Sequence, residues 1–441
     1  MTANSWVPPL PDGWQKTTLR RMGRIFAGGT PDRKNEFYWS GGDVPWLNSG
    51  AVNQGVITQP TTFITKQATM NGATRWVAPK SVLIALAGQG KTKGMSARTE
   101  IRSTFNQSLA AIEPDGNLDY RYLHYWVQSN YQNIRNLAGG DLRDGLNLDH
   151  IGSIEIPLPP RATQRDIADY LDHETTEIDK LIGDLQSFDT IYTERQMAQV
   201  SSLIAYPADL STSHACASGI VKAKYLGGIA LGKMLDARQE DADSTTHPYL
   251  RAANVQPMGK LALEDIKHMR FTHREAAHLT IKGGDVLVVE GGVGGYGRAA
   301  YVSGDIPETG FQNSILRLRP HAHADGRFIT YALLLLRHRG YMKMAASVTS
   351  MPHFTVDKLA NTPIPLMNLA RQTEIADELD AMWQRVDSVR DEGKRAITLA
   401  RERRAALITA AVTGQIDVTA RHKPAAEQLE DDIAQGLHRE N

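Results

Sequence analysis

The sequence predicts an α+β fold in which two β-rich domains are separated by two long, antiparallel coiled-coil helices. Two observations lead to this prediction: the second half of the chain repeats the first, and each copy closes with a long helix-forming run. Self-similarity of this kind indicates a duplicated structural unit. We therefore expect two similar units with an internal pseudo-twofold repeat.

Length and composition fit a globular protein with several domains. The chain has 441 residues, of which 41% are hydrophobic and 22% are charged, which is enough for two or three separate cores. A single cysteine, Cys216, excludes an internal disulfide framework and is typical of a reducing compartment. No apolar run reaches the length of about 18 residues that predicts a transmembrane helix, and the first residues lack a signal-peptide pattern. We therefore expect a cytoplasmic protein without a membrane segment.

Net charge does not decide what the chain binds. The 49 basic residues are balanced by 49 acidic ones, whereas a nucleic-acid-binding protein is usually basic. Acidic residues gather in patches on the predicted helices, for example between Asp166 and Asp179. A net charge of zero is therefore compatible with basic surfaces on the two domains.

The repeat is clearest where each domain passes into its helix. Asp149 falls on Asp357 at a shift of 208 residues, and Gln164 then falls on Gln372. Roughly 14 of about 47 aligned positions are identical without a gap, more than chance agreement gives. Further matches, at this shift or a slightly smaller one, are Ile156-Pro157-Leu158 with Ile364-Pro365-Leu366, Leu171-Asp172 with Leu379-Asp380, Phe105-Asn106-Gln107-Ser108 with Phe311-Gln312-Asn313-Ser314, and Pro45-Trp46-Leu47 with Pro248-Tyr249-Leu250.

Each copy ends in a proline-marked extended segment followed by a helix. The helix-forming runs extend from about Thr163 to Ile204 and from about Arg371 to Val412. Apolar residues recur in both runs at alternating steps of about four and three, which predicts a coiled-coil seam of roughly five heptads or more. The seam comprises Ile167, Leu171, Ile178, Leu181, Leu185, Phe188 and Tyr192 in the first run, and Ile375, Leu379, Met382, Val386, Val389, Gly393, Ala396, Ala400 and Leu407 in the second.

These signals divide the chain into five parts. They are a domain at residues 1–160, a helical repeat at 161–206, a second domain at 207–369, a second helical repeat at 370–417, and a polar tail at 418–441 to which we assign no function. Two similar domains on an antiparallel helical spacer would share the local twofold symmetry of duplex DNA. The arrangement therefore predicts a reader of two short DNA sequences at a set separation.

The same features resemble the specificity (S) subunit of type I restriction-modification systems, over nearly the whole chain. The most specific pieces are ERRAALITAAVTGQIDV (402–418), QTEIADEL (372–379) and the domain openings at 42–57 and 248–261. The resemblance implies that each domain is a target-recognition domain for one half of a bipartite site in double-stranded DNA. It also implies that the helical repeats bind two methyltransferase (M) subunits, and that restriction-translocase (R) subunits join that complex. In the first helical repeat, residues 196–205 lack the leucine-isoleucine-threonine pattern of the second helical repeat. This difference leaves open an unequal binding of the two M subunits.

No motif supports catalysis, a cofactor or a bound metal. Residues 292–297 fit the dinucleotide pattern G-x-G-x-x-G, but RAAYV at 298–302 predicts a strand where a helix should follow. Gly90-Lys91-Thr92 resembles the end of a Walker A motif, yet Ala85 stands where its first glycine is required. HETTE at 173–177 lacks the second histidine of a zinc protease, and the sequence has no N/D-P-P-[FYW] methyltransferase segment. We therefore expect a non-catalytic subunit without cofactor or metal.

Candidate DNA contacts lie on loops at corresponding places in the two domains. Some belong to the glycine-rich loops, and others to the segments at 139–147 and 347–355, which differ in sequence as two readers of different half-sites should. The amides of Asn106, Gln107, Gln312 and Asn313 suit adenine, but their equivalence favours a shared structural hydrogen bond. The candidates are Lys91, Thr92, Lys93, Arg98 and Arg143 in the first domain, and Tyr296, Arg298, Ser347, Thr349, Ser350 and His353 in the second.

Two other functions stay open at this point. The chain could be the recognition subunit of a related type II system, in which one partner both cuts and methylates DNA. It could also be a two-headed scaffold that binds proteins. Affinity that falls steeply with salt would favour DNA over a protein partner.

Overall fold

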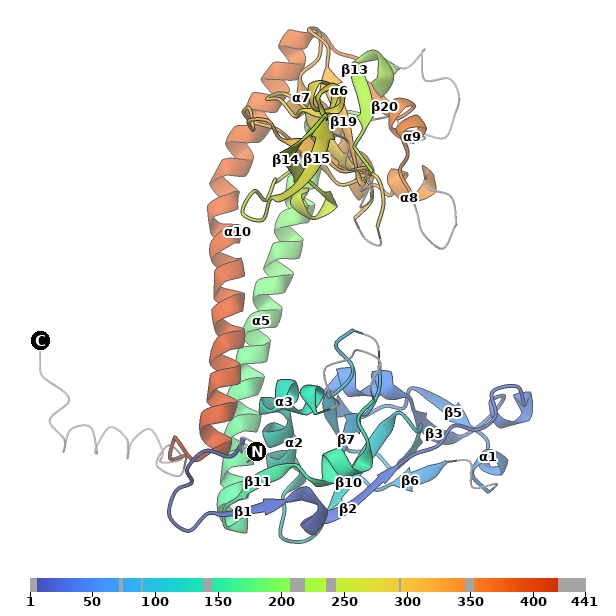
Figure 1. Cartoon of the computed structure of the whole chain (residues 1–441), viewed down its shortest axis with the longest axis vertical. Helices are drawn as coiled ribbons and strands as arrows, with labels where there is room; N and C mark the ends of the chain where they lie inside the picture. The colour runs from blue at the N-terminus through green and yellow to red at the C-terminus, as the bar shows by residue number, and fades with distance from the viewer. Residues whose placement is uncertain are drawn as a thin grey trace, which may run out of the picture. The chain divides into compact units, whose positions relative to one another are not determined.

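The computed structural model describes residues 6–70, 74–88, 90–137, 145–206, 219–234, 243–292, 295–345 and 353–418. The chain forms two compact units: unit 1 comprises Met1–Asp184 and Arg395–Asn441, and unit 2 comprises Leu185–Lys394. Each unit contains one β-rich domain and part of each of two long helices, α5 (Arg161–Leu203) and α10 (Leu369–Val412), as Figure 1 shows. The predicted α+β fold with two long helices is confirmed.

The domain of unit 1 contains three sheets. The central sheet has the order β2-β10-β7-β8-β4, with β2 at Gly23–Ala27, β10 at Leu109–Pro114, β7 at Ser81–Ala85, β8 at Ser96–Thr99 and β4 at Val56–Ile57. A second sheet, β5-β3-β9-β6, comprises Thr62–Ile64, Val44–Leu47, Ser103–Phe105 and Arg75–Val77, and a third pairs β1 (Gln15–Thr18) with β11 (Glu155–Leu158). The short helices are α1 (Lys66–Met70), α2 (Tyr120–Ser129), α3 (Tyr131–Asn136) and α4 (Leu148–Gly152).

The domain of unit 2 repeats this plan, with fewer strands among its described residues. Its central sheet, β13-β19-β16-β17, comprises Gly227–Leu231, Ile315–Pro320, Val286–Val289 and Ala299–Tyr301. The other sheets are β15-β14-β18 (Lys267–Thr272, Ser244–Leu250, Gly310–Phe311) and β12-β20 (Ile220–Lys222, Pro363–Pro365). The helices are α6 (His273–Leu279), α7 (Gly326–His338), α8 (Tyr341–Ala345) and α9 (Val356–Ala360). Strand β17 lies where RAAYV predicted a strand, so the helix of a dinucleotide-binding motif is absent from that position.

The local sequence explains the matching elements. Strand β16 (VLVV) is a continuous apolar run, and β7 (SVLIA) is apolar after Ser81. Every residue in both strands is buried, as expected for strands covered on both faces. Helix α2 begins at Asp119, whose side chain accepts from the backbone amides of Arg121 and Tyr122. Helix α7 begins at Asp325 with the same type of N-cap. The duplication therefore extends to the signals that start each element.

The two long helices run antiparallel within each unit. In unit 1 the Arg404 guanidinium contacts the Asp179 carboxylate at 2.9 Å, while Ile167 and Leu171 share a buried cluster with Ile408 and Val412. In unit 2 Arg390 is ion-paired with Asp189, and Met197 and Val200 share a cluster with Ile375 and Leu379. None of the helices that the structure describes is long and apolar enough to cross a membrane.

The predicted seam is wrong in several places. Leu181 is 50% exposed in unit 1, and Phe188 and Val389 are 40% and 43% exposed in unit 2. The seam residues Ile167, Leu171, Ile375 and Leu379 are buried in clusters to which helices of the domains also contribute. Two helices alone bury only a narrow stripe, so the seam is fully buried only where a domain adds a further layer.

A buried glutamine joins each domain to its long helix. In unit 1 the Gln164 side-chain oxygen accepts from the Asp119 amide (2.8 Å), and its nitrogen donates to the carbonyls of Asn117 (3.0 Å) and Pro159 (2.9 Å). Both glutamines are only 1% exposed, which explains why Gln164 and Gln372 stand at equivalent places in the repeat. In unit 2 Gln372 accepts from Asp325 (2.9 Å) and donates to His323 (3.3 Å) and Met367 (2.8 Å).

Replacing this glutamine should destabilise its unit. Gln164→Ala leaves an amide and two carbonyls without their partner, and we expect the free energy of unfolding to fall by about 3 kcal/mol in urea titrations. Gln186→Ala, on the exposed side of the same helix, should change it by less than about 0.5 kcal/mol. Equal effects of the two substitutions would contradict the role of Gln164.

Candidate nucleic-acid interface

The structure brings the two sets of candidate loops together in each domain. In unit 1 the backbone amide of Leu146 donates to the carbonyl of Leu86 (2.8 Å), which joins the segment before α4 to the start of the glycine-rich loop. In unit 2 the amide of Phe354 donates to the carbonyl of Glu290 (2.6 Å) in the same way. These bonds make Leu86 equivalent to Glu290, and Leu146 equivalent to Phe354.

Helix α3 holds the glycine-rich loop of unit 1. The Arg135 guanidinium donates to the carbonyls of Gly90 (2.6 Å) and Lys93 (3.1 Å), and the Tyr131 hydroxyl donates to the carbonyl of Lys91 (2.7 Å). Gly94 has φ +84°, and a Cβ there would lie 3.2 Å from the Cα of Arg135, so this position favours glycine. The loop is thus held at three carbonyls while the side chain of Lys91 stays exposed.

The loop of unit 2 is held at the corresponding carbonyl. The Arg337 side chain, from the last turn of α7, donates to the carbonyl of Tyr296 (3.3 Å), just before Gly297 with φ +71°. A Cβ on Gly297 would lie 2.8 Å from the Cγ of Met342. Burial and the neighbouring charge of Arg298 lower the pKa of Arg337. In both units an arginine therefore binds the carbonyl that precedes a glycine in the left-handed region.

The remaining candidates occupy different environments. Lys93 is only 5% exposed, while Thr92 is half-buried. The Arg298 side chain donates to the carbonyls of Gly295 (3.2 Å) and Ala252 (3.5 Å), so it supports its own loop. Tyr296 is half-buried against the core of unit 2. Arg143, Ser347, Thr349 and Ser350 lie outside the described residues.

Two of the four amide side chains beside these loops, those of Asn106 and Gln312, form local structural hydrogen bonds. The Asn106 side-chain oxygen accepts from the backbone amide of Ser108 (3.1 Å). The equivalent Gln312 accepts from the hydroxyl of Ser314 (3.4 Å). Asn106 closes the turn that precedes β10, and Gln312 closes the turn that precedes β19.

Arg98 lies on β8 and faces helix α5. Its guanidinium is 15% exposed and binds the carboxylate of Asp172 at 2.7 Å. That carboxylate also accepts from the Tyr125 hydroxyl (2.7 Å) and from Arg121 (3.0 Å). Burial disfavours the charged carboxylate, but the hydrogen bonds from Tyr125 and Arg98 outweigh it and lower the pKa of Asp172. Arg98 thus fixes the domain to the helix.

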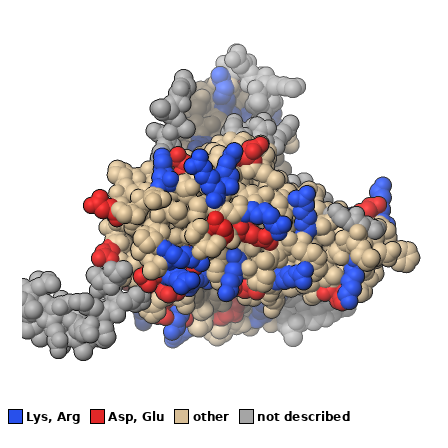
Figure 2. Space-filling view, turned by 90° about the horizontal axis from the view of Figure 1, so that it is seen from below, with Lys and Arg blue, Asp and Glu red and all other residues tan. Residues whose placement is uncertain are grey.

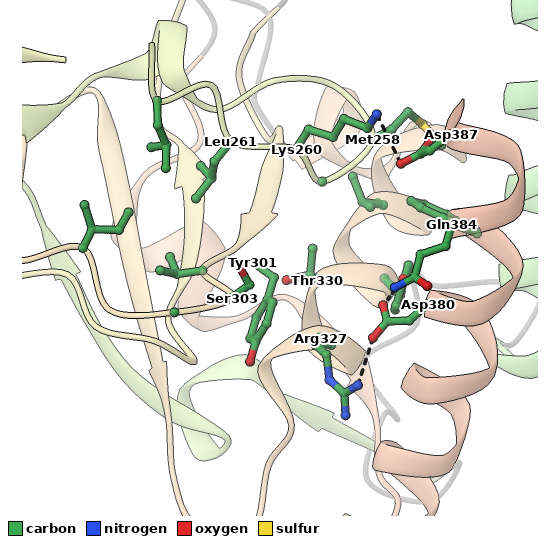
Figure 3. A pocket seen from close by; sticks show the side chains of 18 of the residues that line it. Met258, Lys260, Leu261, Tyr301, Ser303, Arg327, Thr330, Asp380, Gln384 and Asp387 are labelled. Atoms are coloured by element: carbon green, nitrogen blue, oxygen red, sulfur yellow. Dashed lines mark hydrogen bonds and ion pairs between the residues drawn. The ribbon is translucent and has the colours of Figure 1, made fainter. Parts of the chain in front are cut away.

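Unit 2 repeats this anchor without the second arginine. The Arg327 guanidinium binds Asp377 (2.6 Å) and Asp380 (2.9 Å), and the Tyr331 hydroxyl donates to Asp380 (2.6 Å). Tyr301 takes the place of Arg98, since the register pairs Arg98 with Val82 and Tyr301 with the matching Val286. Tyr301 lines a cavity of about 590 Å³, and Figure 3 shows it there with Arg327 beside Asp380.

Several basic side chains on the outer strands of unit 1 form ion pairs with acidic side chains of the same domain. Lys16 contacts Glu155 at 3.1 Å, and Arg24 contacts Glu113 at 2.6 Å. Figure 2 shows a face of the molecule on which basic side chains stand among acidic ones. Among the residues that the structure describes, no cluster of His, Cys, Asp and Glu could hold a metal ion. The loops are therefore the better candidates for a nucleic-acid interface.

Comparison with known proteins identifies the family. The family model described as the type I restriction modification DNA specificity domain matches twice, over residues 11–183 and 221–395. The chain belongs to this family. The resemblance seen in the sequence is confirmed, and the two matches agree with one specificity domain in each unit.

Individual relatives cover different shares of the chain. The StySPI specificity subunit of Salmonella potsdam is 20% identical over 422 residues, which span 92% of this chain and 90% of that protein. The EcoR124I/EcoR124II specificity subunit of Escherichia coli is 25% identical over 159 residues, 35% of this chain and 39% of that protein. A chain of a solved type I R-M system structure covers 93% of this chain and all of its own length, with TM-score 0.62 and 15% identity. That likeness shows that the two chains share a fold.

Sequence analysis missed the residues that hold these loops and domains. Arg135, Arg337 and Glu290 lie outside the motifs that we examined. Asp172 and Asp380 were matched in the ungapped repeat, but the match does not show that they bind arginines of the domains.

Buried His124 should make the stability of unit 1 depend on pH. Burial, and next the charge of Arg98, lower its pKa from 6.5 to about 4. Between these pH values the unfolded state binds more protons, so stability is fully present above pH 6.5 and is lost as pH falls towards 4. The loss should be about 3 kcal/mol. Urea unfolding of His124→Gln should lack this loss, and equal pH profiles would contradict the assignment.

Removing the Arg135 side chain should loosen the glycine-rich loop of unit 1. Because Arg135 binds two of the three loop carbonyls that are held from α3, we expect Arg135→Ala to speed amide hydrogen exchange at residues 90–95 by roughly tenfold. Gln132→Ala, exposed on the same helix, is the matched control. Unchanged exchange in the Arg135 variant would show that the loop holds its shape without this arginine.

Proposed function

We propose that the chain is the DNA-specificity subunit of a type I restriction-modification complex in the cytoplasm. It recognises a bipartite site in double-stranded DNA, docks two M subunits and the R subunits, and carries no catalytic residue itself. The observation that carries this proposal is the pair of specificity-domain matches, combined with loops that are held alike but differ in sequence. Neither the type II alternative nor the protein-binding scaffold is favoured by this family match.

In this proposal the domain boundaries stay as the sequence predicted them. Residues 1–160 and 207–369 are the target-recognition domains, and residues 161–206 and 370–417 are the helical repeats. Lys91, Thr92 and Arg143 contact DNA from the first domain. Tyr296, Arg298, Ser347, Thr349, Ser350 and His353 do so from the second. Lys93 is buried and Arg98 is bound to Asp172, so we assign both a supporting role.

Exposed apolar side chains on the long helices support the docking of M subunits. In unit 1 Leu181 and Leu399 are 50% and 63% exposed. In unit 2 Ile191 and Val389 are 65% and 43% exposed. Large apolar side chains on a helix favour burial against a partner, so the helices offer surface beyond what they use to bind each other.

The proposal is tested by methylation. The chain is purified with its cognate M subunits, and methylated adenines are mapped in DNA treated with the complex. We expect a motif of two short, different sequences with a set spacer, and affinity that falls steeply with salt because counterions are released. Methylation without a split motif, or binding that ignores salt, would contradict the proposal. An R subunit with helicase motifs in the complex would separate the type I assignment from a type II system.

A further inference from the structure

Glu290 and His353 form a pair beside the glycine-rich loop of unit 2. The His353 ring nitrogen Nδ1 lies 2.9 Å from the Glu290 carboxylate oxygen Oε2, and the two side chains are 48% and 20% exposed, respectively. Glu290 directly follows β16, and His353 directly precedes Phe354, whose amide binds the Glu290 carbonyl. The pair therefore stands where the two candidate loops of this domain meet.

The backbone around the pair fixes its geometry. Gly291 and His353 form a β-bridge, and a Cβ on Gly291 would lie 2.8 Å from Nδ1 of His353. The imidazole thus fills the space that a side chain at residue 291 would need. From the other side, the Lys358 ammonium donates to the His353 carbonyl (2.7 Å). The imidazole that binds the Glu290 carboxylate is therefore fixed by the backbone bridge to Gly291 and by Lys358.

Unit 1 has the opposite arrangement at the equivalent place. The matching hydrogen bond from Leu146 to Leu86 puts Leu86 in the place of Glu290, and Gly145 in the place of His353. Ala87 then stands where unit 2 has Gly291. In unit 2 the glycine, Gly291, lies on the glycine-rich loop, whereas in unit 1 the glycine, Gly145, lies on the segment before α4. Leu86 and Gly145 therefore stand in place of the pair Glu290 and His353. The backbone is shared, but the chemistry presented at this point differs completely.

We infer that Glu290 reads the exocyclic amino group of a cytosine in the half-site of unit 2, and that His353 positions its carboxylate. This inference rests on the proposed function. A carboxylate near DNA is repelled by phosphates, so its favourable contact is with a hydrogen-bond donor on a base edge. Cytosine presents only a donor, N4, in the major groove, whereas guanine presents only acceptors. Adenine presents its N6 donor next to the N7 acceptor, whose lone pair repels a carboxylate. With Oε2 bound to His353, Oε1 is the acceptor for that donor.

Substitution of the pair should change one position of the methylated motif. We expect Glu290→Gln, in complex with the M subunits, to lower the preference for cytosine at one position of one half-site by roughly tenfold or more. The other half-site should stay unchanged. His353→Gln should relax the same position more weakly, because the carboxylate remains but is less well held. The readout is the fraction of each variant motif that is methylated, with binding competition at the altered position.

A second variant transplants the arrangement of unit 1. The double substitution Gly291→Ala and His353→Gly removes the imidazole and should relax the same motif position as Glu290→Gln does. The matched control is Glu308→Gln, because Glu308 also faces a histidine, His247, at 3.9 Å, but is 81% exposed and lies outside both candidate loops. This control should leave the whole motif unchanged.

The outcomes separate the inference from the proposed function. If the wild-type complex methylates a split motif and the Glu290 and His353 variants methylate the same motif with unchanged preference, the inference is overturned and the function stands. If Glu290→Gln strengthens binding to all sequences equally, the carboxylate faces phosphate and the inference is again overturned. If the wild-type complex shows no split motif, the proposed function fails, and the inference fails with it.

Discussion

The attachment of each domain to the long helices is the constraint on which the rest of the structure depends. A buried glutamine binds three backbone groups of the domain boundary, and an arginine from the first helical turn after the central sheet binds two aspartates of the long helix. Buried polar groups are costly unless every partner is in place. The spacing of Gln164, Asp169 and Asp172 along α5 therefore tolerates little variation. Gln372, Asp377 and Asp380 keep the same spacing along α10, within the part of the repeat that has no gap.

Loops beyond that attachment are free to differ. Their backbone is held by hydrogen bonds to carbonyls, from Arg135 in unit 1 and from Arg337 in unit 2, and a carbonyl is offered by any residue. The side chain of a residue whose carbonyl is held in this way can thus change without loss of that hydrogen bond. A recognition surface can then change its sequence without losing its shape, which is what a family of proteins with different targets requires.

The sequence was sufficient to predict the duplication, the two long helices and the strand after the glycine-rich loop, because each leaves a periodic or punctuated pattern. It was insufficient where three-dimensional packing decides. Leu181 and Phe188 satisfy the heptad pattern, yet they are 50% and 40% exposed in the part of the chain that the structure describes. Arg98 follows a glycine-rich loop, but the register of β8 turns it towards Asp172 on α5. Glu290 belongs to no motif, and only the bond from Phe354 shows its place beside His353.

The two units also show how a duplicated protein becomes asymmetric. At the anchor Arg98 is replaced by Tyr301, which lines a cavity, while the shared tyrosine and aspartates keep their contacts. At the loops a leucine opposite a glycine is replaced by a glutamate opposite a histidine, with the neighbouring small residue changed in compensation. Both differences occur at positions where the backbone partners are unchanged. Divergence has therefore altered what each domain presents, whereas the contacts that fix each domain to the helices have been kept.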